Sequence, residues 1–198
     1  SPVLIVIQDG KSVGYLNANC FVERLRPEPL PKGWENGLGQ FSATVRTLGE
    51  AADACGCGLY MVGGAVRDLL SDEPIVDLDC TLLGDPSQLA NHLKDNHGGQ
   101  VRHDLSFGAI HWTSPLGQNI DITIARLEAY PNREDLPSVL SSHLLHDLKR
   151  RDFSINAMAI GLHSAQWGTL IDPYGGYADL KSKQIRSLHG MSFIHDPT

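Results

Sequence analysis

The stretch from Leu59 to Thr81 constrains the fold of this chain more than any other. It begins with a short apolar run over 59–62, which has the length and character of a buried strand. The pair Gly63-Gly64 follows, and a backbone without Cβ atoms can turn sharply there and approach a ligand closely. A short helix is predicted over 65–70, and the free N–H groups at its start would suit a phosphate. This order of elements predicts an α/β fold with a phosphate-binding corner.

A second strand, predicted over 75–82, carries two aspartates, Asp77 and Asp79. On a strand, residues two positions apart point to the same face, so both carboxylates are expected to converge on one spot. Two carboxylates that close repel each other, and one or two divalent cations usually resolve the repulsion. Mg²⁺ held by two carboxylates and by substrate phosphates is common where nucleoside triphosphates are handled. The alternative, which a lone Asp-x-Asp leaves open, is a solvent-facing pair on an edge strand.

Four segments together carry a family resemblance. GGAVRDLL (63–70), followed by DLD (77–79), resembles the signature of class II tRNA nucleotidyltransferases and bacterial poly(A) polymerases. RRDFSINAMAI (150–160) is similar to the second motif of that family, and IDPYGGYADLKSKQIRSL (171–188) to the third. SFIHDPT (192–198) resembles the beginning of the fourth. The motifs stand in the family's order, and four such matches in sequence make chance agreement a poor explanation.

The resemblance implies the nucleotidyltransferase fold, an α/β (α+β) architecture in which helices pack against a mixed sheet. It also implies template-independent chemistry, in which an RNA 3′-hydroxyl attacks the α-phosphate of ATP or CTP and pyrophosphate leaves. The expected partners are ATP or CTP and the 3′ end of tRNA, and the expected cofactor is Mg²⁺ on Asp77 and Asp79. CCA addition, CC-only addition, A-only addition and poly(A) tailing all stay open. So does a non-catalytic module that senses nucleotides.

Two further groups of residues follow from the resemblance. In the family, a third carboxylate lies on a strand near the Asp-x-Asp, and Asp121 is the candidate; it would bind a metal or help deprotonate the attacking hydroxyl. Solvation at a strand edge is the alternative for Asp121. The glycines Gly63 and Gly64 would let the backbone meet the phosphates, and Arg67 and Arg151 would neutralise them.

The segment Arg150-Arg151-Asp152 has a physical logic of its own. A guanidinium makes bidentate contacts to triphosphate oxygens, and an adjacent carboxylate accepts hydrogen bonds from ribose hydroxyls. A surface Arg–Asp pair, which contributes little, is the alternative. By resemblance, Arg151 matches the nucleotide-contacting arginine and Asn156 the asparagine of the same motif. Asp196 matches the aspartate that pairs with the incoming base, although His195 stands where the family usually has glutamate.

The net charge and the hydropathy of the chain limit which partners it can bind. The chain has a net charge of −7, whereas a broad RNA-binding surface would demand the opposite sign. If the substrate is RNA, local basic groups or another domain must grip it. No apolar run approaches the roughly 20 residues that span a bilayer, so no membrane association and a cytoplasmic location are expected.

We predict three regions along the chain. Residues 1–26 contain two β-type runs around Asp9-Gly10, a plausible hairpin, and a possible short helix; they resemble the closing half of a CBS regulatory module. Residues 27–40, rich in proline and glycine, read as a linker. Residues 41–198 form the head domain, which is expected to be truncated before the helical neck and body domains of relatives. The other elements predicted in the head are helices over 41–55 and 85–97 and strands over 101–104, 109–113 and 119–126.

Overall fold

A computed structural model describes residues 3–8, 11–17, 28–104, 108–129, 138–141 and 143–188, with side chains described over 28–104, 108–125 and 143–188. The strands are β1 (Val3–Gln8), β2 (Lys11–Asn17), β3 (Glu28–Pro29), β4 (Gly58–Val62), β5 (Leu78–Leu83), β6 (Gln100–Asp104), β7 (Ala109–Thr113), β8 (Asn119–Ile124), β9 (Arg126–Ala129), β10 (Ser138–Ser141), β11 (Ala159–Gly161) and β12 (Thr169–Ile171). The helices are α2 (Ser42–Ala54), α3 (Gly64–Leu70), α4 (Pro86–His92), α5 (Leu144–Lys149) and α6 (Gly176–Lys181), with short 3-10 helices η1 (Trp34–Phe41), η3 (Ser154–Asn156) and η4 (Ser164–Gln166) and a π-helical turn η2 (Leu93–His97).

The main sheet joins eight of the described strands in the order β3-β12-β11-β4-β5-β8-β7-β6. Neighbouring strands are antiparallel except β5 and β8, which run parallel. A parallel pair needs a long crossover, and the chain between β5 and β8 supplies it through α4, β6 and β7. The register sets Asp79 of β5 opposite Val62 of β4 on one side and Asp121 of β8 on the other.

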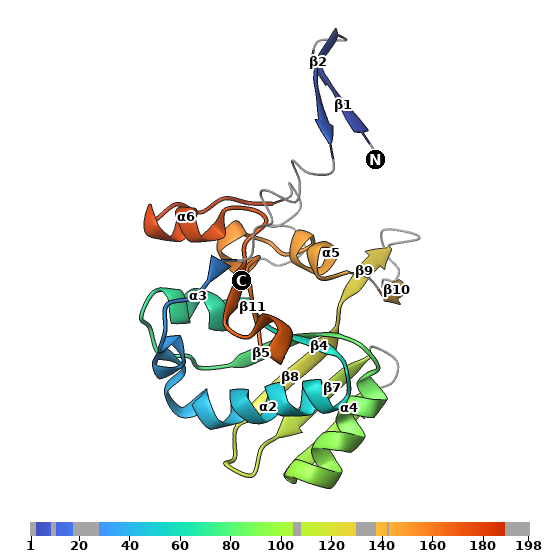
Figure 1. Ribbon diagram of the computed structural model, residues 1–198, viewed down its shortest axis with the longest axis vertical. Helices are drawn as coiled ribbons and strands as arrows, with labels where there is room; N and C mark the ends of the chain where they lie inside the picture. Colours follow the sequence, from blue (N-terminus) through green and yellow to red (C-terminus); the bar gives the residue numbers. More distant parts are fainter. Residues whose placement is uncertain are drawn as a thin grey trace.

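One face of the sheet is covered by α2 and α4, which lie next to each other (Figure 1). The apolar spacing in α2 places Val45, Leu48 and Ala52 on one stripe, and all three are fully buried. They belong to one core cluster with Leu59 and Met61 of β4. Burying a side chain the size of valine, leucine or methionine stabilises the fold by roughly 1.5–3 kcal/mol. This apolar layer anchors the sheet to the helices and leaves the opposite face of the sheet for other contacts.

The opposite face is divided. Behind β4, Tyr60 and Val62 pack with Leu144 and Leu148 of α5 in a second apolar cluster. Over β6, β7 and β8 the outward positions are instead polar and exposed, and they include Arg102, His111, Asn119 and Asp121. The sheet therefore has a covered half and an open half, which meet at β5.

Two sequence predictions need correction. The strand predicted over 75–82 begins only at Leu78, so Asp77 precedes it. Its neighbour β4 ends at Val62, opposite Asp79, and then bends into α3, so residues before Asp79 have no partner on β4. Residues 28–40 also do more than link: β3 pairs with β12 at the edge of the sheet, and Leu38 in η1 is buried in the core.

The predicted hairpin near the start of the chain is present, with β1 and β2 paired antiparallel from Val3↔Asn17 to Gln8↔Lys11. The short helix predicted after it lies outside the described residues, and the resemblance to a CBS module stays a prediction. The helix expected over 85–97 divides into α4 and the π-helical turn η2. Its predicted cap is confirmed, because the Asp85 carboxylate accepts a hydrogen bond of 2.8 Å from the Ser87 N–H and Pro86 takes the first helical position.

Candidate active site

The glycine bend brings β4 against the second motif. Gly63 has φ +71° and ψ −137°, a conformation that side chains other than glycine rarely adopt. A Cβ atom added there would lie 3.0 Å from Nη1 of Arg151 and 4.0 Å from Oδ2 of Asp79. The bend, this arginine and this carboxylate are therefore immediate neighbours, although they come from three separate parts of the sequence.

The acidic residues gather at the same end of the sheet. Asp79 and Asp121 face each other directly across β5 and β8. Asp79 keeps an exposed edge, but partial burial raises the pKa of its carboxyl; Arg151 lowers that pKa, while Asp121 and then Asp77 raise it. Both other carboxylates thus lie close enough to Asp79 to oppose its ionisation. The structure thus places the three predicted acids around the start of β5, with Asp79 and Asp121 directly opposite each other and Asp77 just before the strand.

The donor chemistry suits a hard divalent cation. All three acids offer carboxylate oxygens, the ligands that Mg²⁺ prefers. Burial is the main cause of the raised pKa of Asp79, and Asp121 and then Asp77 raise it further; a bound cation would relieve that repulsion between the acids. Among the described residues, however, no three histidine, cysteine or acidic side chains already stand close enough together to hold an ion. The donor set fits the cation, and its members would have to draw together to bind it.

Arg151 is held from beneath by a buried carboxylate. Asp147 in α5 is fully buried and accepts contacts from Arg150 Nη2 at 2.8 Å, Arg151 Nη2 at 3.4 Å and the Thr81 hydroxyl at 3.0 Å. The Nε of Arg151 is buried and has no hydrogen-bond partner in the described part of the chain. Burial lowers the pKa of the Arg151 guanidinium, and the nearby Asp147 and Asp79 oppose that shift. Buried donors are nearly always paired, so this idle Nε makes Arg151 a candidate ligand-binding group.

Arg67 and the rest of the second motif form a separate network. The Nε and Nη2 of Arg67 contact Oδ1 of Asp68 at 2.9 and 2.8 Å, and Nη1 donates to Oδ1 of Asn156 at 2.9 Å. The Nδ2 of Asn156 donates in turn to Oδ1 of Asp152 at 3.2 Å. The guanidinium folds back over Gly64, where an added Cβ would lie 3.5 Å from Nη2. Its share in phosphate binding stays a prediction.

Asp121 has a partner that sequence reasoning did not identify. His111 lies directly opposite it on β7, and Nδ1 of His111 is 2.5 Å from Oδ1 of Asp121. Asp147 and Thr81 were missed as well. The position of Asp147, three and four residues before two arginines on a helix, is the spacing at which side chains meet, and it was the available signal. The base-pairing candidate, Asp196, lies outside the described residues.

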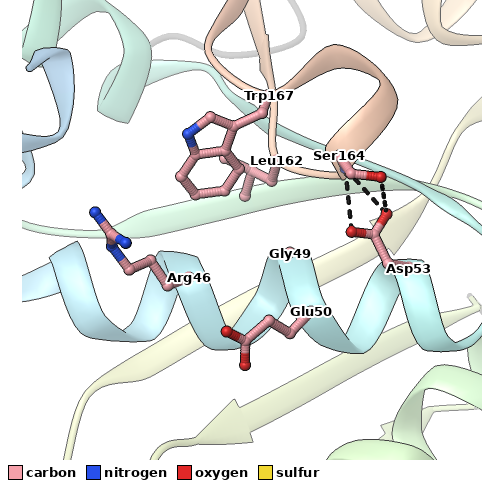
Figure 2. A pocket seen from close by; sticks show the side chains of 7 residues that line it. All are labelled: Arg46, Gly49, Glu50, Asp53, Leu162, Ser164 and Trp167. Carbon is pink, nitrogen blue, oxygen red and sulfur yellow. Dashed lines mark hydrogen bonds between the residues drawn. The ribbon is translucent and has the colours of Figure 1, made fainter. Parts of the chain in front are cut away.

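A separate hollow of about 340 Å³ lies on the side of the sheet that α2 covers (Figure 2). Arg46, Glu50 and Trp167 border it, and the Asp53 carboxylate accepts hydrogen bonds from the backbone N–H and hydroxyl of Ser164 at 3.0 and 2.9 Å. Asp53 therefore ties α2 to the start of η4. The acids of the candidate site lie on the other face, so this hollow is not part of it.

The match to known proteins is decisive for the family. A family model described as the poly A polymerase head domain matches residues 59–186. The chain belongs to this head-domain family. The matched region includes the glycine bend, all three acids and the second motif. The nucleotidyltransferase fold expected from the sequence is confirmed by solved structures of similar proteins.

The relatives of this chain include tRNA nucleotidyltransferases. The A-adding tRNA nucleotidyltransferase of Halalkalibacterium halodurans is 44% identical over 154 residues, which cover 78% of this chain and 36% of that protein. The CC-adding enzyme of Deinococcus radiodurans is 36% identical over 169 residues, covering 85% and 42%. The Thermotoga maritima CCA-adding enzyme complexed with tRNA_CCA has a TM-score of 0.68 at 34% identity, covering 89% and 38%. The chain thus spans 36–42% of the length of these relatives.

Within the described residues, no helix has the length and apolar character needed to cross a membrane.

Proposed function

We propose that this head domain catalyses the addition of a nucleotide to the 3′ end of tRNA, with ATP or CTP as donor and pyrophosphate as the leaving product. The observation that carries the proposal is the junction of Gly63, Asp79 and Arg151, where a side-chain-free bend, a carboxylate and an under-satisfied guanidinium meet. The tRNA nucleotidyltransferases among the relatives support it. A cytoplasmic location, expected from the sequence, is part of the same proposal.

The residues divide the work by position. Gly63 and Gly64 leave the backbone open to the triphosphate, because no side chain stands between the bend and Arg151. Arg151 places a buried positive charge and a free Nε donor where phosphate oxygens would arrive. Asp152, steadied by Asn156, presents its carboxylate to the ribose hydroxyls. These groups bind and orient the nucleotide, and the proposal assigns Asp196 to its base.

The three acids activate the attacking 3′-hydroxyl of the RNA. Asp77 and Asp79 would hold Mg²⁺, which when bound supplies Lewis-acid stabilisation of the phosphate charge and acidifies the attacking hydroxyl. Asp121, on the next strand, is placed to receive the hydroxyl proton. Arg151, beside Asp79, keeps the triphosphate at the same junction. With both reactants held at the end of β5, proximity and charge compensation lower the barrier together.

The proposal is tested with the full-length protein and tRNA transcripts that end before, within and after the CCA sequence, each supplied with labelled ATP or CTP and Mg²⁺. We expect incorporation of a defined nucleotide at one of these ends, with release of pyrophosphate. The greater identity to the A-adding than to the CC-adding relative supports AMP as that nucleotide. Extension of any RNA by long A tracts would instead identify a poly(A) polymerase. Nucleotide binding without release of pyrophosphate would refute the enzyme and identify a sensor.

A further inference from the structure

The open half of the sheet carries a row of polar side chains that leads to the acids. Arg102, His111, Asp121 and Asp79 lie directly opposite one another on β6, β7, β8 and β5. Neighbouring strands are about 4.8 Å apart, so each of these side chains is within reach of the next. A hollow of about 260 Å³ is lined by the first three of them.

The contact within this row has a defined direction. An ionised carboxylate can only accept hydrogen bonds, so Nδ1 of His111 carries the proton in the 2.5 Å contact to Oδ1 of Asp121. The Asp121 side chain is 58% exposed, and an exposed side chain without a partner samples several rotamers. The histidine removes that freedom. Because Oδ1 of Asp121 is bound to His111 on β7, Oδ2 is the oxygen that stays available to a reactant on the β5 side.

We propose that His111 is a positioning residue, which holds Asp121 in the one orientation that serves the transfer reaction. The inference rests on the proposed function. In the step it supports, the O–H bond of the RNA 3′-hydroxyl breaks and its proton passes to Oδ2 of Asp121. The hydroxyl oxygen then forms a bond to the α-phosphorus as the bond from phosphorus to the pyrophosphate oxygen breaks. His111 touches neither reactant and acts through Asp121 alone.

The kinetic test uses three substitutions in the full-length protein. His111→Asn keeps an N–H donor at the position of Nδ1, whereas His111→Gln places it at the position of Nε2 and His111→Ala removes it. Loss of a hydrogen-bonding partner behind an active-site ligand typically costs 10–100-fold in activity, so we expect about that loss in kcat for His111→Ala and His111→Gln. His111→Asn should recover most of the rate. The KM for the nucleotide should stay unchanged, because the triphosphate is held on the Gly63 side.

The chain offers a matched control one step along the same two strands. Thr113 lies opposite Asn119, and its hydroxyl donates to Oδ1 of Asn119 at 2.9 Å. Thr113→Ala therefore removes a polar pair between β7 and β8 without touching Asp121. Its kcat should equal that of the wild type. An equal loss in Thr113→Ala and His111→Ala would show that any cross-strand pair matters here, and it would overturn the positioning role.

A second readout does not depend on activity. In the nucleotide-free protein, ¹⁵N imidazole NMR should show a hydrogen-bonded Nδ1 proton on His111 that disappears in Asp121→Ala and persists in Thr113→Ala. A wild-type ring that is protonated only at Nε2 would overturn the proposal. The kinetic outcomes separate the two levels of inference. A wild-type enzyme that needs Asp79 but tolerates His111→Ala would refute only the role of His111, whereas activity that survives Asp79→Ala would refute the proposed function itself.

Discussion

Two arginines flank the same glycine bend, and their surroundings differ. In Arg67 each of the three nitrogens has a partner: Nε and Nη2 contact Asp68, and Nη1 donates to Asn156. Arg151 is under-satisfied: it has a long contact to Asp147, and its buried Nε has no hydrogen-bond partner in the described part of the chain. A guanidinium whose nitrogens are all paired contributes to the fold, whereas an idle buried donor is costly and leaves an N–H available to a ligand.

The difference also separates positioning from binding within one motif. In the Arg67 network (Arg67, Asp68, Asn156 and Asp152), the charge of Arg67 is balanced by Asp68. A chain of hydrogen bonds from Arg67 through Asn156 orients the Asp152 carboxylate. The Arg151 site (Arg151, Asp147, Gly63 and Asp79) instead places one positive and two negative side chains next to a glycine, where no side chain covers the backbone. We therefore expect substitutions in the Arg151 site to impair catalysis first, and substitutions in the Arg67 network to impair stability first.

The largest effect is expected for Asp79→Asn. Loss of this carboxylate should lower kcat by on the order of 10³-fold, because the charge that organises the reaction is removed. The free energy of unfolding, by contrast, should not fall in this variant at neutral pH. The pKa of Asp79 is raised in the folded protein, so the folded state holds this proton more tightly than the unfolded chain. The free energy of unfolding therefore falls as the pH rises above the unfolded value of about 3.9 and stays lowered above the folded pKa.

Asp79→Asn should remove that loss. At neutral pH, the variant should unfold at the same or a higher denaturant concentration than the wild type, and the difference should vanish at pH values below the unfolded pKa. Denaturant titrations monitored by circular dichroism at several pH values measure this. A variant that is both inactive and less stable at neutral pH would show that Asp79 is a structural residue.

The comparison of the two arginines is tested directly by a pair of matched variants. Arg151→Gln should raise the KM for the nucleotide on the order of 10²-fold, because charge-assisted contacts to the phosphates are lost. Arg67→Gln should change that KM much less and should lower the free energy of unfolding by about 1 kcal/mol, because its hydrogen bonds are partly exposed. Steady-state kinetics and thermal unfolding on both variants decide the matter. An equal rise in KM in both variants would support the phosphate-binding role that the sequence predicts for Arg67.

Much of this site could be predicted from local patterns. The glycine pair after an apolar run predicted the bend, and the alternation in 119–124 predicted that Asp121 and Thr123 share a face of the strand. Resemblance predicted that Arg151 and the acids belong together. These are properties that a few adjacent residues carry, since strand period and glycine freedom act locally.

The remaining features depend on contacts between distant segments. Nothing in the sequence near Asp121 names His111, because that contact depends on the register of β7 against β8. The strand with Asp79 starts later than predicted, because β4 bends away at Gly63 and leaves Asp77 without a ladder partner. Residues 28–40 have the composition of a linker, yet Leu38 is buried in the core. Tertiary packing decided each of these cases.

The support beneath Arg151 gives the next prediction. Asp147 is fully buried among two arginines and Thr81, so Asp147→Asn leaves cationic groups without a counter-charge. We expect a loss of about 3 kcal/mol in the free energy of unfolding and a rise of about tenfold in the KM for the nucleotide. Thr81→Val is the matched control. It deletes one hydrogen bond to the same carboxylate but keeps its charge, and it should cost only about 1 kcal/mol without changing KM. A variant Asp147→Asn with wild-type KM would mean that Arg151 needs no support from below.

The smallest effect is expected at the bend itself. In Gly63→Ala, the added methyl group would lie 3.0 Å from Nη1 of Arg151, the end of a side chain that can shift by a few tenths of an ångström. The positive φ adds strain of about 1–3 kcal/mol. Gly175 is the control: its φ of +74° is similar, although its ψ of +27° lies in the left-handed helical region, and an added Cβ there would meet nothing within 4 Å. Both variants should therefore lose stability, while only Gly63→Ala should also raise the KM for the nucleotide. If the two variants raise KM equally, or neither does, backbone strain rather than contact with Arg151 explains the glycine at this bend, and the Arg151 site extends no further than its own side chains.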